Sequence, residues 1–223
     1  MLDQVAERER AKYERVWTGS AYRRWAWPCE EDARQMVARF GAQPGQTVID
    51  YGSGQCRAMK MFRQAGLEPL GIDIAENAMP EGAPFTVIQA TLWDLPEGLG
   101  PSDYCFCRDV IEHLPEDKVD QALAGIAART RIGGFIQPGL TLDRCGPLLI
   151  GEPLHLTVKP AEWWIERLGR HFDVEDAGRT RNDFQAKLYV RAKADVFVFV
   201  SSFEDEKRNT VPCETECETR KQA

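Results

Sequence analysis

Short apolar runs alternate with amphipathic stretches along the middle of the chain. The apolar runs are bounded by glycine, proline or polar clusters, which is typical of buried strands. They cover 47–51, 68–74, 85–90, 103–108 and 135–142. Amphipathic stretches at 56–66 and from about Asp109 to Arg131 separate some of these runs and predict helices. Strands that alternate with helices predict an α/β fold with a doubly wound parallel sheet.

The N-terminal part of the chain departs from this alternation. Charged stretches at 2–15 and 30–40 predict two helices, and Gly41 with the Pro44-Gly45 turn would end the second. We therefore expect a helical cap over residues 1–45, ahead of the first strand.

The C-terminal part departs from it as well. The pair Gly133-Gly134 predicts a turn into the strand at 135–142, and the runs at 171–180 and 184–193 predict an antiparallel hairpin. Residues 201–223 are polar and mixed in charge, so we expect a disordered tail there. The pattern thus predicts a single domain over residues 1–200.

Composition and charge narrow the class of protein. The 223 residues are 43% hydrophobic and 28% charged, which suits one globular domain with a sizeable core. A formal net charge of −7 disfavours nucleic acid as a partner. The N-terminus lacks the apolar core of a signal peptide, no stretch suits a membrane span, and the seven cysteines follow no disulfide framework. These features predict a cytoplasmic protein with reduced thiols and no membrane partner.

The segment VIDYGSGQCR, residues 48–57, joins the first predicted strand to the next helix. A dinucleotide fingerprint that starts at Gly52 would need glycine at position 57, where Arg57 stands. Instead Asp50 precedes the pair Gly52 and Gly54, and Asp73 ends the next strand, where a carboxylate can take both ribose hydroxyls. This order indicates a nucleoside cofactor that carries no phosphate.

Five segments in this order and spacing resemble a class I S-adenosylmethionine-dependent methyltransferase. They are VIDYGSGQC, GIDIAENAM, ATLWDLP, DYCFCRDVIEHL and RIGGFIQPG. The resemblance covers about 13–193 and implies a Rossmann-like, seven-stranded, mostly parallel sheet whose C-terminal hairpin is antiparallel. It also implies S-adenosyl-L-methionine as cofactor and an enzyme of the small-molecule type, similar to the ubiquinone-pathway O-methyltransferase group.

The resemblance implies a role for each matched position. The backbone at Gly52 and Gly54 would pass under the methionine part of the cofactor, and Asp50 would hold this loop or the amino group. The remaining positions are Asp73 at the ribose, Ile74 beside the adenine, Thr91 and Leu92 at the adenine edge, and Cys107 and Arg108 at the methionine end. Thr91 stands where the family often has Asp, and Cys56 stands where it usually has a third glycine.

Two further segments have candidate roles. Tyr13, Trp17, Tyr22 and Arg23 could form a lid over the cofactor, or an aromatic cluster that closes one edge of the core. In this family the segment at 141–168 commonly shapes the substrate pocket. It contains Arg144, Glu152, His155, Trp163 and Trp164.

Methyl transfer from a sulfonium needs alignment of the acceptor and, for some acceptors, a general base. His113 and His155 are the candidate bases among three histidines. The helix predicted from about Asp109 would place Asp109, Glu112 and His113 on one face near the cofactor. Alternatively, Asp109 caps this helix, and Glu112 and His113 bond the sheet edge.

Three function classes stay open at this point. The favoured one is a methyltransferase that acts on oxygen or nitrogen of a small-molecule acceptor. The second is a divalent-metal-assisted RNA 2′-O-methyltransferase, since small-RNA 2′-O-methyltransferases carry a similar E-x-x-E-H motif and a later histidine. In that case Asp109, Glu112, His113 and His155 would bind manganese, iron or zinc.

The third class is a cofactor-binding module without turnover, which the intact DVIEHL and both acids, Asp50 and Asp73, disfavour. The sequence predicts neither the acceptor nor the oligomeric state.

Overall fold

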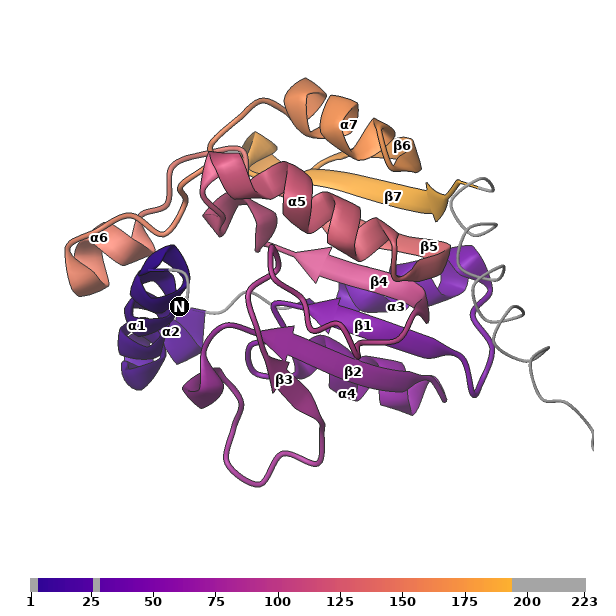
Figure 1. The fold of residues 1–223 in the computed structure, drawn as a ribbon, viewed down its shortest axis with the longest axis horizontal. Helices are drawn as coiled ribbons and strands as arrows, with labels where there is room; N and C mark the ends of the chain where they lie inside the picture. The colour runs from indigo at the N-terminus through magenta and orange to yellow at the C-terminus, as the bar shows by residue number, and fades with distance from the viewer. Residues whose placement is uncertain (1–3, 26–28, 194–223) are drawn as a thin grey trace, which may run out of the picture. The chain divides into compact units, whose positions relative to one another are not determined.

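Seven strands form one sheet in the order β3-β2-β1-β4-β5-β7-β6 in this computed structural model, which describes residues 4–25 and 29–193 (Figure 1). Strands β1 to β5 pair in parallel, whereas β7 runs antiparallel to both β5 and β6. The strands are β1 (Thr47–Tyr51), β2 (Glu68–Asp73), β3 (Val87–Gln89), β4 (Ser102–Arg108), β5 (Thr130–Gln137), β6 (Phe172–Arg179) and β7 (Ala186–Ala192). The predicted doubly wound sheet with an antiparallel C-terminal hairpin is confirmed. The predicted tail at 201–223 lies outside the described residues.

Helices cover both faces of the sheet (Figure 1). They are α1 (Gln4–Thr18), α2 (Ser20–Trp25), α3 (Glu30–Phe40), α4 (Arg57–Gln64), α5 (Glu116–Ala127), α6 (Cys145–Ile150) and α7 (Ala161–Gly169). Three short 3₁₀ turns complete the set: η1 (Glu76–Ala78), η2 (Ile111–His113) and η3 (Arg181–Asp183). α5 and α7 pack on one face of the sheet, and α3 and α4 pack on the other.

Strand β4 shows how the two cores form from one strand. Tyr104 and Phe106 pack with α3 and α4, while Cys105 and Cys107 pack with α5 and α7. Side chains alternate between the faces of a strand, so a central parallel strand buries both sets and is apolar throughout. This explains why the sequence shows runs of apolar residues here rather than strict alternation.

The long helix predicted from about Asp109 to Arg131 is wrong at both ends. Asp109 adopts φ 60°, η2 follows, and Leu114 is extended, so α5 begins only at Glu116. Pro115 explains this start, because proline disfavours a helical conformation in the residue before it. The other end is already strand, since β5 begins at Thr130.

The pair Gly133-Gly134 lies inside β5 and does not form the predicted turn. A Cβ atom on Gly133 would lie 2.2 Å from the Val190 carbonyl oxygen of β7. A Cβ atom on Gly134 would lie 1.9 Å from the Cys105 carbonyl oxygen of β4. The two glycines therefore allow the neighbouring strands to approach closely, and β5 covers 130–137 rather than 135–142.

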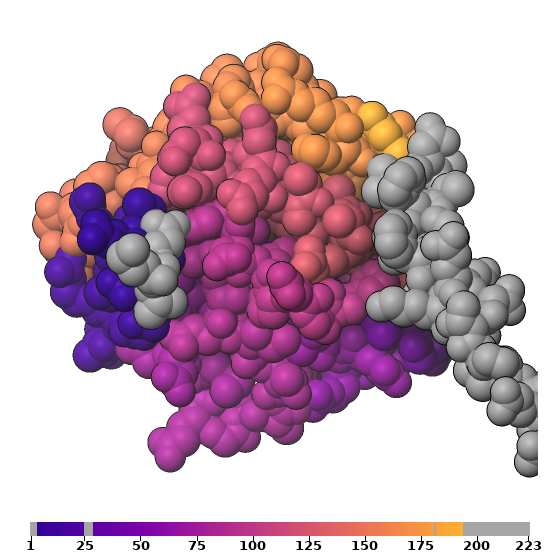
Figure 2. Space-filling model, viewed as in Figure 1, coloured from indigo at the N-terminus to yellow at the C-terminus, as the bar shows by residue number. Residues whose placement is uncertain are grey.

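The N-terminal helices lie beside the carboxyl ends of the parallel strands (Figure 1). The side chain of Arg23 donates hydrogen bonds to the carbonyl oxygens of Trp17, Asn77 and Ala78, which fastens α2 to η1. Arg15 forms an ion pair with Glu152, just after α6. In the space-filling view the indigo α1 and the orange α6 segment meet at the surface (Figure 2). These contacts enclose the end of the sheet where α/β folds bind ligands.

Candidate active site

Two cavities open at the carboxyl ends of the parallel strands. The smaller has a volume of about 110 Å³ and the larger about 590 Å³. Gly52, Gly54 and His113 line both, so the cavities adjoin one another. Trp17 and Tyr22 from the N-terminal helices also line both, and Tyr13 lines the smaller. The N-terminal aromatic residues therefore form part of the site as well as a packed cluster with Ala75 and Ala78.

The glycine loop after β1 is tightly wound. Gly52, Gly54 and Cys56 all have positive φ angles, of 79°, 47° and 58°. A Cβ atom on Gly52 would lie 2.3 Å from a methyl group of Val110, and one on Gly54 would lie 3.3 Å from the Trp17 ring. The positive φ angles favour glycine at both positions, and space requires it at Gly52, where the approach to Val110 leaves no room for a Cβ atom.

Asp73 and Asp50 bring two buried carboxyl groups to this loop. The Asp73 Oδ2 accepts a hydrogen bond from the Gly54 amide at 2.8 Å, and its Oδ1 accepts one from the Ala75 amide at 2.9 Å. Burial raises the pKa of Asp73, and burial together with the Asp73 charge raises the pKa of Asp50 to about 8. Each Asp73 oxygen keeps acceptor capacity for a ligand hydroxyl beyond its backbone bond.

The other residues predicted for the cofactor are divided among the cavities and the core. Asp73, Ile74, Thr91 and Leu92 line the smaller cavity, whereas Asp50 and Arg108 line the larger. Arg108 also donates from Nε to Asp32 Oδ2 at 2.9 Å, which fastens α3 to the end of β4.

Cys107, predicted at the methionine end, lines neither cavity. Its side chain is fully buried in the core beside α5 and α7. The alternation of β4 directs it to that face, while the next residue, Arg108, reaches the larger cavity.

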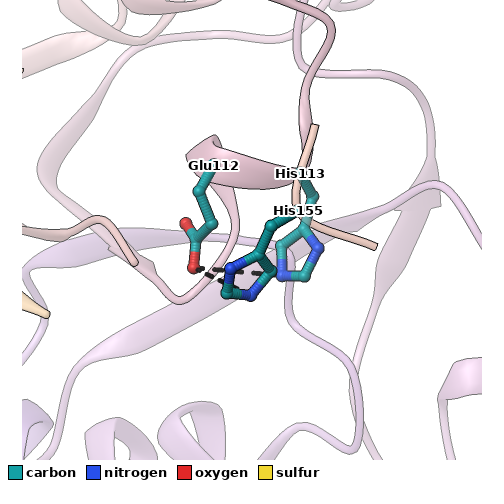
Figure 3. Close-up of side chains that lie close together, drawn as sticks. All are labelled: Glu112, His113 and His155. Carbon is teal, nitrogen blue, oxygen red and sulfur yellow. Dashed lines mark ion pairs between the residues drawn. The ribbon is translucent and has the colours of Figure 1, made fainter. Parts of the chain in front are cut away.

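Glu112, His113 and His155 converge at the border of the two cavities (Figure 3). The Glu112 side chain is fully buried, and its Oε1 lies 4.0 Å from His113 Nε2 and 3.9 Å from His155 Nε2. Backbone hydrogen bonds hold the segment of His155 beside η2. The Glu112 carbonyl oxygen accepts hydrogen bonds from the amides of Leu156 and Thr157, both at 2.9 Å. The predicted helical face is therefore wrong, but the predicted proximity of these side chains to one another is observed.

Hydrogen bonds orient both imidazole rings. The His155 Nδ1 lies 2.6 Å from the Thr141 carbonyl oxygen, which can only accept, so Nδ1 carries the hydrogen and Nε2 keeps its lone pair. The His113 Nδ1 lies 2.6 Å from the Tyr13 hydroxyl oxygen and 3.2 Å from the Leu154 carbonyl oxygen. Tyr13 of α1 thus contacts a candidate catalytic histidine directly.

Two neighbouring carboxyl groups, those of Asp109 and Glu112, would repel each other if both were ionised. Burial and the neighbouring Asp109 raise the pKa of Glu112 well above its usual value. Burial opposes ionisation of Asp109, but Glu112 and His113 outweigh it and lower the pKa of Asp109. Burial and the neighbouring His155 lower the pKa of His113 to about 4. Burial therefore favours the protonated form of Glu112 and the neutral form of His113.

The donor set fits a divalent metal ion. Within the described ranges, Glu112, His113 and His155 form a group whose ligand atoms lie within 4.8 Å of one another. Neither Glu112 oxygen has a hydrogen bond of regular geometry in this part of the chain. A histidine whose Nδ1 donates to a carbonyl oxygen is oriented to bind metal through Nε2. Asp109 neighbours Glu112 but is not one of the three grouped ligands, and it accepts a hydrogen bond from Gln185.

Sequence reasoning missed several residues that build the site. Gly139 is one, since a Cβ atom there would lie 2.6 Å from Glu112 Oε1 and 3.0 Å from the His155 ring. Asp143 is another, since its carboxylate accepts hydrogen bonds from the amides of Leu154 and His155. For Gly139 the Pro-Gly pair at 138–139 is a turn signal, although the apolar pattern predicts a strand over 135–142.

Comparisons with known proteins agree with this architecture. Residues 49–137 match the family described as a methyltransferase domain. The chain is similar in structure to magnesium protoporphyrin IX methyltransferase from Synechocystis PCC 6803 with bound SAM, at 17% identity and a TM-score of 0.62, over 86% of this chain and 99% of that one. It is similar to Burkholderia thailandensis 1,6-didemethyltoxoflavin-N1-methyltransferase with bound 1,6-didemethyltoxoflavin and S-adenosylhomocysteine, at 18% identity and a TM-score of 0.56, over 76% and 80% of the chains.

A third similar structure is a putative methyltransferase from Haloferax volcanii in complex with the Trm112 activator, at 14% identity and a TM-score of 0.56, over 74% and 92% of the chains. At these identities the likeness concerns the fold. A search of curated protein sequences finds no significant match. No helix within residues 4–25 and 29–193 is long and apolar enough to cross a membrane.

Proposed function

We propose that this chain, whose residues 49–137 match a methyltransferase-domain family, transfers a methyl group from S-adenosyl-L-methionine to an oxygen or nitrogen of a small-molecule acceptor. Its fold, which is similar to that of structures with bound SAM or SAH, supports this proposal. The observation that carries the proposal is the Asp73 carboxylate, which closes the glycine loop and lines the smaller cavity. Two of the similar structures are enzymes named for small molecules, which supports this class of acceptor.

The smaller cavity suits the adenosine part of the cofactor. In this proposal Asp73 accepts hydrogen bonds from the ribose hydroxyls, and Ile74 and Leu92 contact the adenine. The methionine part extends over Gly52 and Gly54 toward Asp50. The larger cavity, which also has His113 and His155 in its wall, is left for the acceptor.

The chemistry needs little covalent help from the protein. The acceptor's lone pair forms a bond to the methyl carbon, and the carbon–sulfur bond breaks with its electrons moving to sulfur. An acceptor proton then leaves to a base. Without a metal ion at His155, this proton would be held on Nε2, because Nδ1 already carries hydrogen. In this proposal Tyr13, Trp17 and Tyr22 of α1 and α2, which line the smaller cavity, exclude water from the sulfonium.

We infer divalent-metal assistance as a second feature of the same function, because a specific group of ligands favours it. Glu112, His113 and His155 would hold the ion, and their mixed oxygen and nitrogen atoms suit manganese, iron or zinc better than magnesium. A metal ion at this position would lower the pKa of an acceptor hydroxyl. The acidic net charge of −7 gives no support to RNA as the acceptor.

We also propose a cytoplasmic location. All five cysteines within the described residues are free thiols, which supports a reducing compartment.

Mass spectrometry tests the proposed reaction. The protein is incubated with S-adenosyl-L-methionine and a collection of small molecules with hydroxyl or amine groups, and products are screened for a gain of one methyl. We expect methylation of at least one acceptor and its loss in His155→Ala. Cofactor binding without turnover on any acceptor class would instead favour a cofactor-binding module.

Metal removal tests the second feature. We expect chelator treatment to lower the midpoint of thermal unfolding or the methylation rate, and manganese to restore it. Glu112→Gln should abolish the response, because the carboxylate ligand is lost, whereas His171→Gln should keep it, because His171 lies outside the cluster. Full activity in chelator, with no manganese bound to the wild-type protein, would end the metal proposal.

A further inference from the structure

The smaller cavity contains a charged side chain that the cofactor fingerprint does not explain. Its walls are mostly apolar, with Ile74, Leu92, Val110 and Leu114 among them. Glu9 of α1 also lines it, although this residue lies outside the matched domain at 49–137. The residue is only 5% exposed, so its carboxylate is held inside the site and away from bulk water.

Glu9 is held there by a buried ion pair. Lys12, one turn further along α1 and 4% exposed, pairs with Glu9 Oε2 and lies 3.5 Å from the Pro153 carbonyl oxygen. Within the described ranges, the Glu9 carboxylate forms this ion pair and no regular side-chain or amide hydrogen bond, so it keeps acceptor capacity for a ligand donor. Burying such an ion pair costs the solvation free energy of both charges. Apolar residues of similar volume often stabilise a protein at least as well, so stability alone does not explain this pair.

A second possible hydrogen-bonding group lines the same cavity. The Thr91 hydroxyl is buried and has no hydrogen-bond partner within the described ranges. Buried polar atoms generally have a hydrogen-bond partner. An unpartnered hydroxyl that lines a cavity therefore indicates a ligand group that hydrogen-bonds with it. Glu9 and Thr91 thus give this mostly apolar cavity two groups that can accept hydrogen bonds.

We propose that Glu9, with Thr91, recognises the 6-amino group of the cofactor's purine, an inference that rests on the proposed cofactor. With the ribose at Asp73, the base lies in the cavity that contains Ile74 and Leu92. The 6-amino group is the strong hydrogen-bond donor of adenine, and a carboxylate is the matching acceptor. A 6-oxo purine would instead bring a carbonyl oxygen against the carboxylate, and a site built this way rejects such an analogue.

Calorimetry with two ligands tests this assignment. S-adenosylhomocysteine carries the 6-amino group, and S-inosylhomocysteine carries a 6-oxo group in its place. We expect the wild-type protein to prefer the amino ligand by at least about tenfold, the scale of one hydrogen bond to a charged group. Glu9→Gln should reduce the preference to within about threefold, because a carboxamide can accept from the amine or donate to the oxo group.

Controls separate recognition from folding. Glu7→Gln changes an exposed carboxylate on the same helix and should keep the wild-type preference. The double variant E9Q/K12M removes both buried charges, so it leaves no lone ammonium if Glu9→Gln alone fails to fold. Because the preference is a ratio measured on one sample, a reduced folded fraction does not change it.

The outcomes distinguish this inference from the proposed function. If wild-type protein binds both ligands equally, or Glu9→Gln and E9Q/K12M keep the full preference, Glu9 does not recognise the purine amine, although the cofactor proposal survives. If wild-type protein binds neither ligand, both fail.

Discussion

At the residue scale, Asp73 carries the cofactor proposal, because its carboxylate is assigned to the ribose and also bonds the Gly54 amide. We expect Asp73→Ala to weaken S-adenosylhomocysteine binding by about 2–4 kcal/mol, the loss of two hydrogen bonds to a charged group. Calorimetry measures the change. Asp94→Ala, at an exposed position two residues after Leu92, should bind as wild type. If Asp73→Ala and the wild-type protein bind S-adenosylhomocysteine with equal affinity, Asp73 does not bind the ribose.

Buried carboxyl groups also predict a pH dependence of stability. The pKa of Asp50 is raised to about 8 by burial, from an ordinary value of 3.8. Between these pH values the unfolded chain has lost the proton and the folded chain keeps it, so the stability gained from the raised pKa declines as pH rises. Glu112 acts in the same direction, because its pKa is raised too. His113 acts oppositely below about pH 6.5, because its lowered pKa makes protonation favour the unfolded chain.

Calorimetric unfolding from pH 5 to pH 8 tests this account. We expect the unfolding midpoint of Asp50→Asn to fall less over this range than that of the wild-type protein, because the amide does not titrate. Parallel pH profiles for the two proteins would show that Asp50 titrates normally in the folded state.

At the element scale, β5 depends on glycine for its contacts. A Cβ atom on Gly134 would lie 1.9 Å from a β4 carbonyl oxygen, so Gly134→Ala must displace a central strand. We expect a loss of about 3 kcal/mol in the free energy of unfolding, the upper range for overpacked cores. Denaturant unfolding measures it, with Gly98→Ala, which meets no atom within 4 Å, as the control. A stable Gly134→Ala variant would show that β4 and β5 can separate freely.

The same scale shows which elements a sequence pattern can predict. The helix 30–40 and the strand 47–51 have their predicted bounds, because an apolar pattern and clear end signals coincide there. The helix predicted from Asp109 failed, because its periodicity continued through Pro115, and α2 was not predicted at all. The turn predicted at Gly133-Gly134 is wrong, because the close approach of β4 and β7 leaves no signal in the local sequence.

At the scale of the whole molecule, the site is assembled from segments far apart in the chain. The predicted positions after β1 and β2 reach the cavities because parallel strands present their carboxyl ends together. The contribution of Glu9 and the meeting of Glu112 with His155 depend on contacts between distant segments, which no local pattern encodes. The suggested likeness to ubiquinone-pathway O-methyltransferases stays a prediction, since the matched family is described only as a methyltransferase domain.

The central claim is that the glycine loop and Asp73 bind S-adenosyl-L-methionine, and one calorimetric titration with S-adenosylhomocysteine and NAD tests it most directly. The loop has Arg57 where a dinucleotide fingerprint needs glycine. We therefore predict saturable binding of S-adenosylhomocysteine at one site and no heat from NAD. Binding of NAD with no response to S-adenosylhomocysteine would contradict the account.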